Sequence, residues 1–312
     1  SEMCIRDSMD MVCEKNADTV HDFDKDPIKP YIDGEWVKAK GTTLGADDGI
    51  GIAAALAVLT DENIQHGPLE CLFTVDEETG LTGAFALQPG FFQGKILLNL
   101  DSEDEGEIFI GCAGGIDTVI RLPYRKMVLP AHKFAVQVKV KGLQGGHSGA
   151  EIDKNRANAN KLMGRFLYGL KKKAEYALIS LTGGQKDNAI TRECTAEFLT
   201  DSVAEVKAYA KELQEQLREE YTGSDENITF EITEKGTATA EVLHPTSQEK
   251  IVFYLQNVPF GIQKMSGTIK GLVETSSNIG ILRLDRDELF ASSSVRTVSY
   301  THLRAHETSQ DL

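Results

Sequence analysis

Acidic side chains recur where the sequence predicts that a strand or a helix begins or ends. They are Asp10 at the start of a first apolar strand, Asp47 and Asp48 ahead of an apolar helix, Glu77 and Glu78 after a strand over 69–75, and Asp101 after a strand over 95–100. In open α/β sheets, sites form beyond the carboxyl ends of the strands. Carboxylates gathered there repel one another unless cations neutralise them. The pattern predicts two divalent metals bridged by a carboxylate, a shared water activated as hydroxide, and a neighbouring Glu as general base.

Each acid taken singly has a plainer interpretation. Asp47 and Asp48 could cap the helix that follows, because Asp is favoured at helix N-termini. Glu77 and Glu78 could cap the next helix, and Asp101 could open a solvated acidic turn. The plain interpretation is preferred for any one acid, whereas the whole set favours metals. A module that binds calcium or magnesium through the same oxygens stays open as an alternative.

The first third of the chain predicts a layered α/β domain that would position these acids. The apolar runs at 69–75 and 95–100 are short and almost continuous, which is typical of strands covered on both faces by helices. The segment 49–60 is apolar all round and rich in Gly and Ala, which predicts a buried helix lying close to the sheet.

The pattern changes from about Gly115, where strands and helices no longer alternate strictly. Strands are predicted over 134–142, 176–184, 195–200 and 228–233, and amphipathic helices over 155–173 and 203–221. Such a mixture indicates an α+β module. We therefore expect a layered α/β domain at 1–114, an α+β domain at 115–297, and a separate tail at 298–312.

The composition restricts the partners and the compartment. A formal net charge of −15, spread along the chain, disfavours nucleic acids and anionic membrane surfaces as partners. No apolar run approaches the roughly 18 residues that span a bilayer. The 5 cysteines show no CxxC spacing, which is typical of a reduced, cytoplasmic protein.

Several sequence blocks, in the same order, closely resemble the aminoacyl-histidine dipeptidases, also called Xaa-His or beta-alanyl-histidine dipeptidases. The blocks are MDMVCEKN, TTLGADDGIGIAAALAVL, CLFTVDEETGLTGAFAL, LLNLDSEDEGEIFIGCAGG and VKGLQGGHSGAEIDKNRANA. These enzymes are cytosolic relatives of carnosinase in the di-zinc exopeptidase superfamily. The resemblance implies an incomplete catalytic α/β domain with an inserted α+β lid, and hydrolysis of Xaa-His and other short unblocked dipeptides by a hydroxide between two Zn²⁺ ions. Mn²⁺ or Co²⁺ are possible substitutes, and a homodimer through the lid stays open.

The resemblance also implies a role for each acid that matches a motif. Asp47 corresponds to the carboxylate that bridges both zincs, and Glu77 to the general base. Glu78 corresponds to a ligand of one zinc and Asp101 to a ligand of the other. Asp10 corresponds to the Asp that orients a zinc-binding His two positions earlier, and such an outer partner fixes the tautomer and angle of the imidazole.

Three further residues match the lid of the family. His147 in GGHSG resembles the His that donates a hydrogen bond to the scissile carbonyl oxygen. Asn188 in DNAITRE and Arg296 in SSSVRT resemble the pair that meets the substrate backbone and its free carboxylate. The plainer interpretations are a structural His in a Gly-rich turn, a loop Asn and a surface cation at a strand end.

The sequence departs from the family at both ends. Ser8 stands where the HxD motif has its zinc-binding His, and a hydroxyl is a poor zinc ligand beside an imidazole. The other imidazole ligand of the family would lie beyond Leu312. Residues 1–8 and 298–312 do not resemble the family and are interpreted as foreign, so His302 and His306 are not expected to be ligands. For the chain as it stands we expect weak metal binding and little or no peptidase activity, so an inactive fragment is the alternative.

Overall fold

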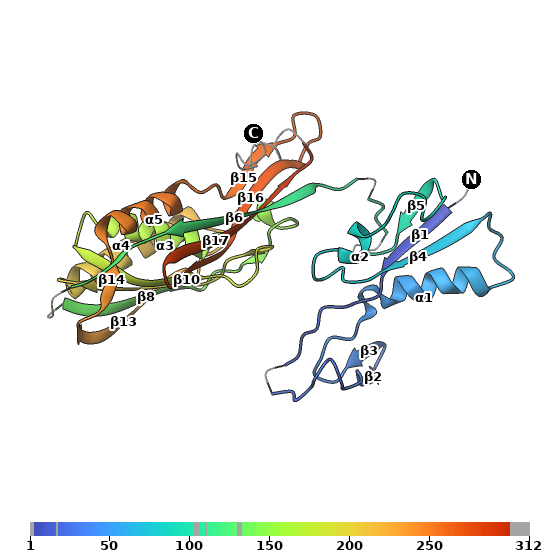
Figure 1. Ribbon diagram of the computed structural model, residues 1–312, viewed down its shortest axis with the longest axis horizontal. Coiled ribbons are helices and arrows are strands. Elements are labelled where there is room, and N and C mark those ends of the chain that lie inside the picture. The colour runs from blue at the N-terminus through green and yellow to red at the C-terminus, as the bar shows by residue number, and fades with distance from the viewer. Residues whose placement is uncertain (1–2, 17, 103–105, 110, 130–132, 300–312) are drawn as a thin grey trace. The chain divides into compact units, whose positions relative to one another are not determined.

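A computed structural model describes residues 3–16, 18–102, 106–109, 111–129 and 133–299 (Figure 1). The chain divides into two compact units, Ser1–Phe109 and Ile110–Leu312, which we call the first and second unit. The division falls slightly before the predicted boundary at Gly114, which begins a strand. His302, His306 and most of the predicted tail lie outside the described residues.

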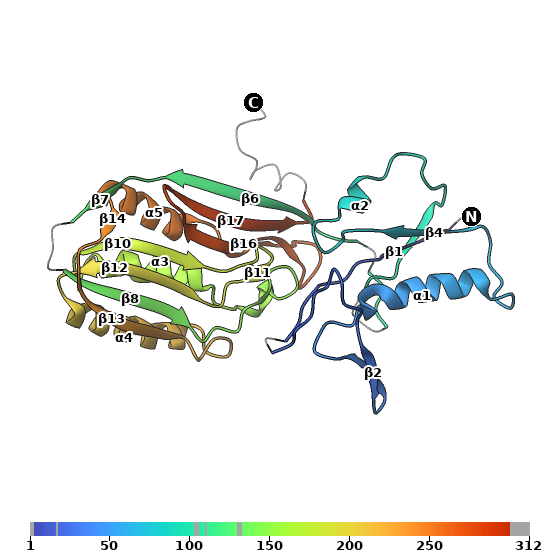
Figure 2. The ribbon, with the colours of Figure 1, turned by 60° about the horizontal axis from the view of Figure 1, so that its bottom comes forward.

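The first unit contains a three-stranded parallel sheet with the order β4-β1-β5. Its elements are β1 (Met3–Ser8), β2 (Pro30–Asp33), β3 (Trp36–Ala39), α1 (Ala46–Thr60), β4 (Leu69–Thr74), α2 (Thr82–Phe85) and β5 (Ile96–Asn99). Strands β2 and β3 form a separate hairpin. Because all three strands of the sheet are parallel, their carboxyl ends meet at one edge (Figures 1 and 2).

The prediction that Asp10 opens the first strand is wrong. The strand is Met3–Ser8, so Asp10 follows its carboxyl end instead. Two of the four buried side chains in β1 are polar, Asp7 and Ser8. The strand therefore has no continuous apolar run from which it could be predicted. Residues 3–8, which are interpreted from the sequence as foreign, form the central strand of this sheet. The correction places Asp10 at the same edge as the residues after β4 and β5.

The helix after Asp48 is present, but the prediction that it is buried is wrong. In α1 only Asp48, Gly51 and Ala55 are buried, whereas Ile50 is 68% exposed. The small side chains lie against the sheet: a Cβ on Gly51 would come within 1.9 Å of an Asp7 carboxylate oxygen. All residues of β5 are exposed as well. Within the described residues, helices therefore do not cover both faces of this sheet.

The second unit is built around an eight-stranded sheet with the order β13-β8-β12-β10-β16-β17-β6, with β15 paired to β16. Its strands are β6 (Gly114–Pro123), β7 (Lys126–Val128), β8 (Lys133–Lys141), β9 (Gly146–His147), β10 (Tyr176–Gly183), β11 (Ala189–Ile190), β12 (Cys194–Thr200), β13 (Thr229–Ala238), β14 (Glu241–Leu243), β15 (Gly261–Met265), β16 (Val273–Leu284) and β17 (Glu288–Thr297). Its helices are η1 (Ile152–Lys154), α3 (Ala159–Leu170), α4 (Val203–Glu220) and α5 (Pro245–Asn257). Figure 2 shows this sheet with its helices.

The helices α3, α4 and α5 share one apolar core with the large sheet. Leu162, Phe166 and Leu170, the predicted stripe of α3, are at most 1% exposed and lie at its centre. Asn158 begins α3, because its side chain accepts hydrogen bonds from two backbone N–H groups of the first turn. The predicted mixed α/β architecture is confirmed. None of the described helices is long and apolar enough to cross a membrane.

Candidate active site

Asp10 links the end of β1 to the loop after β4. Its two carboxylate oxygens accept hydrogen bonds from the backbone N–H groups of Glu77 (3.0 Å) and Glu78 (3.1 Å). Burial raises the pKa of Asp10, but these two hydrogen bonds, a further backbone hydrogen bond and the charge of Arg6 together hold the pKa below its ordinary value. Asp10 is therefore an ionised anchor that positions both glutamates.

Asp47 and Asp48, at the start of α1, have different surroundings. Both have non-helical backbone angles. An oxygen of Asp48 accepts from the Gly51 backbone N–H at 2.9 Å, so Asp48 makes the capping bond. Asp47 is exposed, and it lines a cavity of about 260 Å³ together with Glu78. The plainer capping interpretation thus describes Asp48, while Asp47 and Glu78 face the same space.

Five carboxylates lie at this edge of the sheet, which we call the acidic edge (Asp10, Asp47, Glu77, Glu78 and Asp101). Several of them repel one another. Burial raises the pKa of Glu78, and the charges of Glu77 and Asp47 raise it further. Burial likewise raises the pKa of Asp101, with Asp47 again among the repelling charges. Carboxylates whose pKa values rise in each other's presence are stabilised by a nearby cation.

Asp7 belongs to the same neighbourhood, although no motif marks it. Its side chain is fully buried in β1 and points toward Asp48 under α1. Burial raises the pKa of Asp7 to about 6, and the Asp48 carboxylate contributes to the rise. One oxygen of each carboxyl group has no hydrogen-bond partner among the described residues. A proton shared between the two carboxyl groups would give each of these oxygens a hydrogen-bond partner and would remove the repulsion between the groups.

Arg6 is the cation that the structure places beside the acidic edge. Its guanidinium donates to Thr74 Oγ1 at 3.1 Å and to Asn99 Oδ1 at 3.2 Å, and it lies 3.5 Å from Asp101 Oδ2. This charge opposes the rise in the pKa of Asp101. Arg6 was not predicted as a site residue, because a cation inside a short strand carries no motif.

The acidic edge fits a divalent metal in charge and in donor type. Carboxylate oxygens suit Mg²⁺, Ca²⁺ and Mn²⁺, and they also bind Zn²⁺, which takes imidazole readily. The repulsion among Asp47, Glu78 and Asp101 is the unbalanced charge that such an ion would neutralise. Among the described residues, however, no three His, Cys, Asp or Glu side chains converge as a ready-made metal site. Ser8 offers a hydroxyl at the position where the family resemblance predicts an imidazole.

The second unit brings His147 and Asn188 together. Ala189 in β11 pairs with His147 in β9, and the Ser148 N–H donates to the Asn188 carbonyl at 2.8 Å. The Ala150 N–H donates to Nδ1 of His147 at 3.1 Å. A neutral imidazole that accepts at Nδ1 carries its proton on Nε2, so the outer nitrogen of this exposed ring is the donor.

Arg296 lies beside the turn that follows His147. A Cβ on Gly149 would lie 3.0 Å from Arg296 Nε, so the guanidinium packs against the turn that carries His147. The Nε atom is buried and has no hydrogen-bond partner among the described residues. A buried guanidinium nitrogen of this kind is suited to an anionic ligand.

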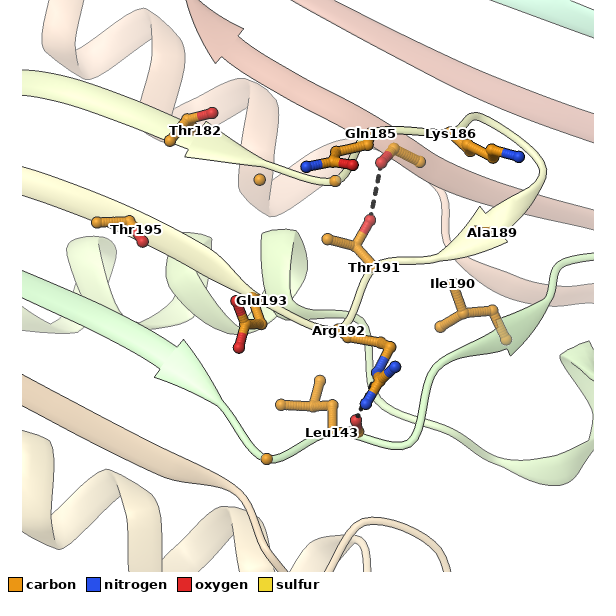
Figure 3. A pocket seen from close by; sticks show the side chains of 14 residues that line it. Leu143, Thr182, Gln185, Lys186, Ala189, Ile190, Thr191, Arg192, Glu193 and Thr195 are labelled. Atoms are coloured by element: carbon orange, nitrogen blue, oxygen red, sulfur yellow. Dashed lines mark hydrogen bonds between the residues drawn. The ribbon is translucent and has the colours of Figure 1, made fainter. Parts of the chain in front are cut away.

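A cavity of about 620 Å³ lies beside β11 (Figure 3). Its lining comes from β11 and the residues after it, from residues 142–143 and 182–186, and from Gly280. Thr191 Oγ1 donates to the Gly280 carbonyl at 2.9 Å, and Arg192 Nε donates to the Leu143 carbonyl at 3.4 Å. Lys186 also lines the cavity. Thr191 and Arg192 belong to the DNAITRE block that carries Asn188, but none of these three cavity residues was predicted as a site residue.

Part of the second unit matches a known family model, and most of the chain is similar to a known dipeptidase. Residues 138–225 match the peptidase dimerisation domain. The chain is 47% identical over 278 residues to the cytosol non-specific dipeptidase of Escherichia coli strain K12, a match that covers 88% of this chain and 57% of that protein. A segment of 70 residues is 43% identical to peptidase T of Escherichia coli O1:K1 and covers 22% of this chain and 17% of that protein.

A solved structure gives the same result. The aminoacylhistidine dipeptidase of Vibrio alginolyticus is 42% identical, with a TM-score of 0.77 over 98% of this chain and 62% of that one. The predicted resemblance to the aminoacyl-histidine dipeptidases is therefore confirmed. The chain spans somewhat less than two thirds of the length of these relatives, and the roles of the individual site residues stay predictions.

Proposed function

We propose that this chain is part of a metal-dependent dipeptidase that acts on short unblocked dipeptides, including those that end in His. The observation that carries the proposal is the acidic edge, where Asp47, Glu78 and Asp101 follow or face the ends of parallel strands and repel one another. The similarity to two dipeptidases supports the reaction and the substrate class.

In this proposal Asp47, Glu78 and Asp101 would hold the metal, with Asp47 shared between two ions. Two Zn²⁺, or Mn²⁺ or Co²⁺ in their place, would when bound polarise the scissile carbonyl and acidify a water. Ser8 supplies no imidazole, so we expect weaker metal binding and slower turnover than in a relative with His at this position.

Glu77 is the proposed general base. It takes a proton from the attacking water and passes one to the leaving amine. Its position depends on Asp10, because one Asp10 oxygen holds the Glu77 N–H and the other holds the Glu78 N–H. Asp10 thus keeps the base and a proposed metal ligand in fixed relation.

The second unit would supply the polar contacts to the substrate. His147 would donate from Nε2 to the developing oxyanion, an interaction typically worth about 2.7–4 kcal/mol. Arg296 would bind the free carboxylate of the dipeptide through its guanidinium, and Asn188 would meet the substrate backbone. A homodimer through the lid and a cytosolic location are further parts of the proposal, supported by the domain match and by the name of the Escherichia coli relative.

The experiment is hydrolysis of Ala-His by the full chain with added MnCl₂ or ZnCl₂. We expect slow hydrolysis that EDTA abolishes and that Glu77→Gln lowers by about 10²–10⁴-fold, as loss of a general base does. Glu62→Gln is the matched control, because Glu62 is exposed after the end of α1. Hydrolysis as fast as that of an intact relative would contradict the expected weak activity, and hydrolysis that is equal in Glu77→Gln and Glu62→Gln would contradict the role of Glu77.

A further inference from the structure

Arg6 and Ser8 lie on the same face of β1. Side chains two apart in a strand share a face, and the one between them points the other way. Asp7 points toward α1, since its carboxylate lies next to Gly51 of that helix. Arg6 therefore stands on the face opposite α1, in the same row as the position where the family has its metal-binding His.

The guanidinium of Arg6 reaches along that row to the level of Ser8. Ser8 pairs with Thr74 in the β1–β4 register, and Arg6 donates to Thr74 Oγ1. Its other terminal nitrogen reaches across to Asn99 at the end of β5 and to Asp101 beyond it. The positive charge thus bridges the carboxyl ends of both neighbours of β1.

Partial burial and two further hydrogen bonds fix the position of the Arg6 guanidinium beside Asp101. The Arg6 and Asp101 side chains are only 14% and 23% exposed, so solvent screens the pair less than it screens an exposed ion pair. Two neutral oxygens on different strands fix the orientation of the guanidinium. Surface ion pairs of the first unit, such as Lys38 with Asp33, have no such support, with side chains 49% and 57% exposed.

We propose that Arg6 is a built-in counter-ion that competes with a divalent metal for Asp101. The inference rests on the proposed function in taking Asp101 as a metal ligand. Arg6 neutralises part of the acidic edge while the metal is absent, and a metal that binds Asp101 must displace the guanidinium. Arg6 acts through Asp101 and contacts no reacting atom, so it is a residue that sets metal affinity.

The test measures binding of Mn²⁺ alone, by electron paramagnetic resonance of the free ion and by calorimetry, with the full chain and no substrate. Arg6→Gln removes the charge but keeps an amide that can donate to Thr74 or Asn99. Lys38→Gln is the matched control, because it removes one positive charge from an exposed pair of the same unit. The expected result is an affinity about tenfold higher for Arg6→Gln and unchanged for Lys38→Gln, equivalent to about 1.4 kcal/mol.

The double variant Arg6→Gln/Asp101→Asn locates the effect. If the competition is for Asp101, the gain from Arg6→Gln disappears when Asp101 is already neutral. An affinity for Mn²⁺ that is unchanged or weaker in Arg6→Gln, or a gain that persists in the double variant, overturns the proposal. An Arg6→Gln chain that unfolds and is refolded by Mn²⁺ supports it, because the metal then replaces the missing charge; one that stays unfolded with Mn²⁺ overturns it.

These readouts separate the inference from the proposed function. Tighter Mn²⁺ binding by Arg6→Gln stands even if the chain hydrolyses no dipeptide. Conversely, metal-dependent hydrolysis combined with an unaltered Mn²⁺ affinity in Arg6→Gln removes the counter-ion role and leaves the dipeptidase proposal intact.

Discussion

The two units bury different kinds of side chain. The second unit buries a continuous apolar core that runs from α3, α4 and α5 into the large sheet. The first unit has only Cys4, Ile5, Ala55 and Leu72 as buried hydrophobic side chains among its described residues, and it buries Asp7 and Asp48 beside them.

Apart from Arg296 Nε, which also has no partner among the described residues, the two units differ in how they treat a buried charged group. In the second unit the Lys161 ammonium is satisfied by three carbonyls, those of Leu255, Gln256 and Val258. In the first unit Asp7 and Asp48 each keep a buried oxygen without a hydrogen-bond partner among the described residues. The comparison teaches that the second unit is organised by packing, whereas the first is organised around charges that need a cation or a proton.

The largest expected effect is on the packed core of the second unit. Phe166→Ala should lower the free energy of unfolding by about 3–5 kcal/mol, because Phe166 is fully buried between α3 and the sheet. In the first unit Phe85→Ala should cost less than about 0.5 kcal/mol, since Phe85 is 81% exposed. Urea unfolding followed by circular dichroism measures both. Equal costs would remove the contrast between the units.

The second effect is a pH dependence confined to the first unit. The pKa of Asp7 is raised from its ordinary value of 3.8 to about 6, so the folded state holds a proton there that the unfolded chain has lost. The protonated Asp7 therefore contributes to the free energy of unfolding, and this stabilisation is complete below about pH 4. It is lost as the pH rises through 6, a change on the order of 2 kcal/mol.

Hydrogen exchange of the β1 amides at pH 4 and pH 7 measures this dependence. Protection of residues 3–8 should fall with rising pH in the wild-type chain and should stay nearly level in Asp7→Asn, which cannot ionise. An equally steep fall in Asp7→Asn would assign the dependence to another group.

The smallest effect concerns the anchor of the two glutamates. Asp10→Asn keeps the size of the side chain but replaces one of the two carboxylate oxygens that accept from the Glu77 and Glu78 N–H groups with an amide NH₂ group, which donates and cannot accept. The expected loss is about 1.5 kcal/mol, typical of a hydrogen bond to a charged group. Exchange of the Glu77 and Glu78 amides should accelerate, while that of the α3 amides should not. Unchanged exchange at both glutamates would show that Asp10 does not hold them.

Most of the second unit could be predicted from the sequence, because its elements are long and periodic. The α3 stripe and the strands over 134–142 and 195–200 alternate or repeat as their structures require. The helix over 203–221 is strongly amphipathic and ends within one residue of the prediction. Regular patterns of this kind follow directly from packing one face on a core.

The first unit was harder to predict, because its central strand carries charge. Arg6, Asp7 and Ser8 make β1 unlike an apolar strand, so the sequence predicts the first strand around Asp10 instead. The placement of Asp47, Glu78 and Asp101 followed from strand ends and family motifs. The Arg6 pair with Asp101 and the Asp7 contact with Asp48 depend on register and on the approach of Gly51, which a single sequence does not encode in any motif.

The central claim is that the acidic edge of the first unit holds divalent metal. Its most direct test is an anomalous difference map, measured at the zinc edge, from crystals of this chain grown with ZnCl₂. We predict peaks within coordination distance of the Asp47 carboxylate, one of them also near Glu78 and the other near Asp101, with the Arg6 guanidinium displaced from Asp101. A map whose peaks all lie elsewhere, with Arg6 still paired to Asp101, would contradict it.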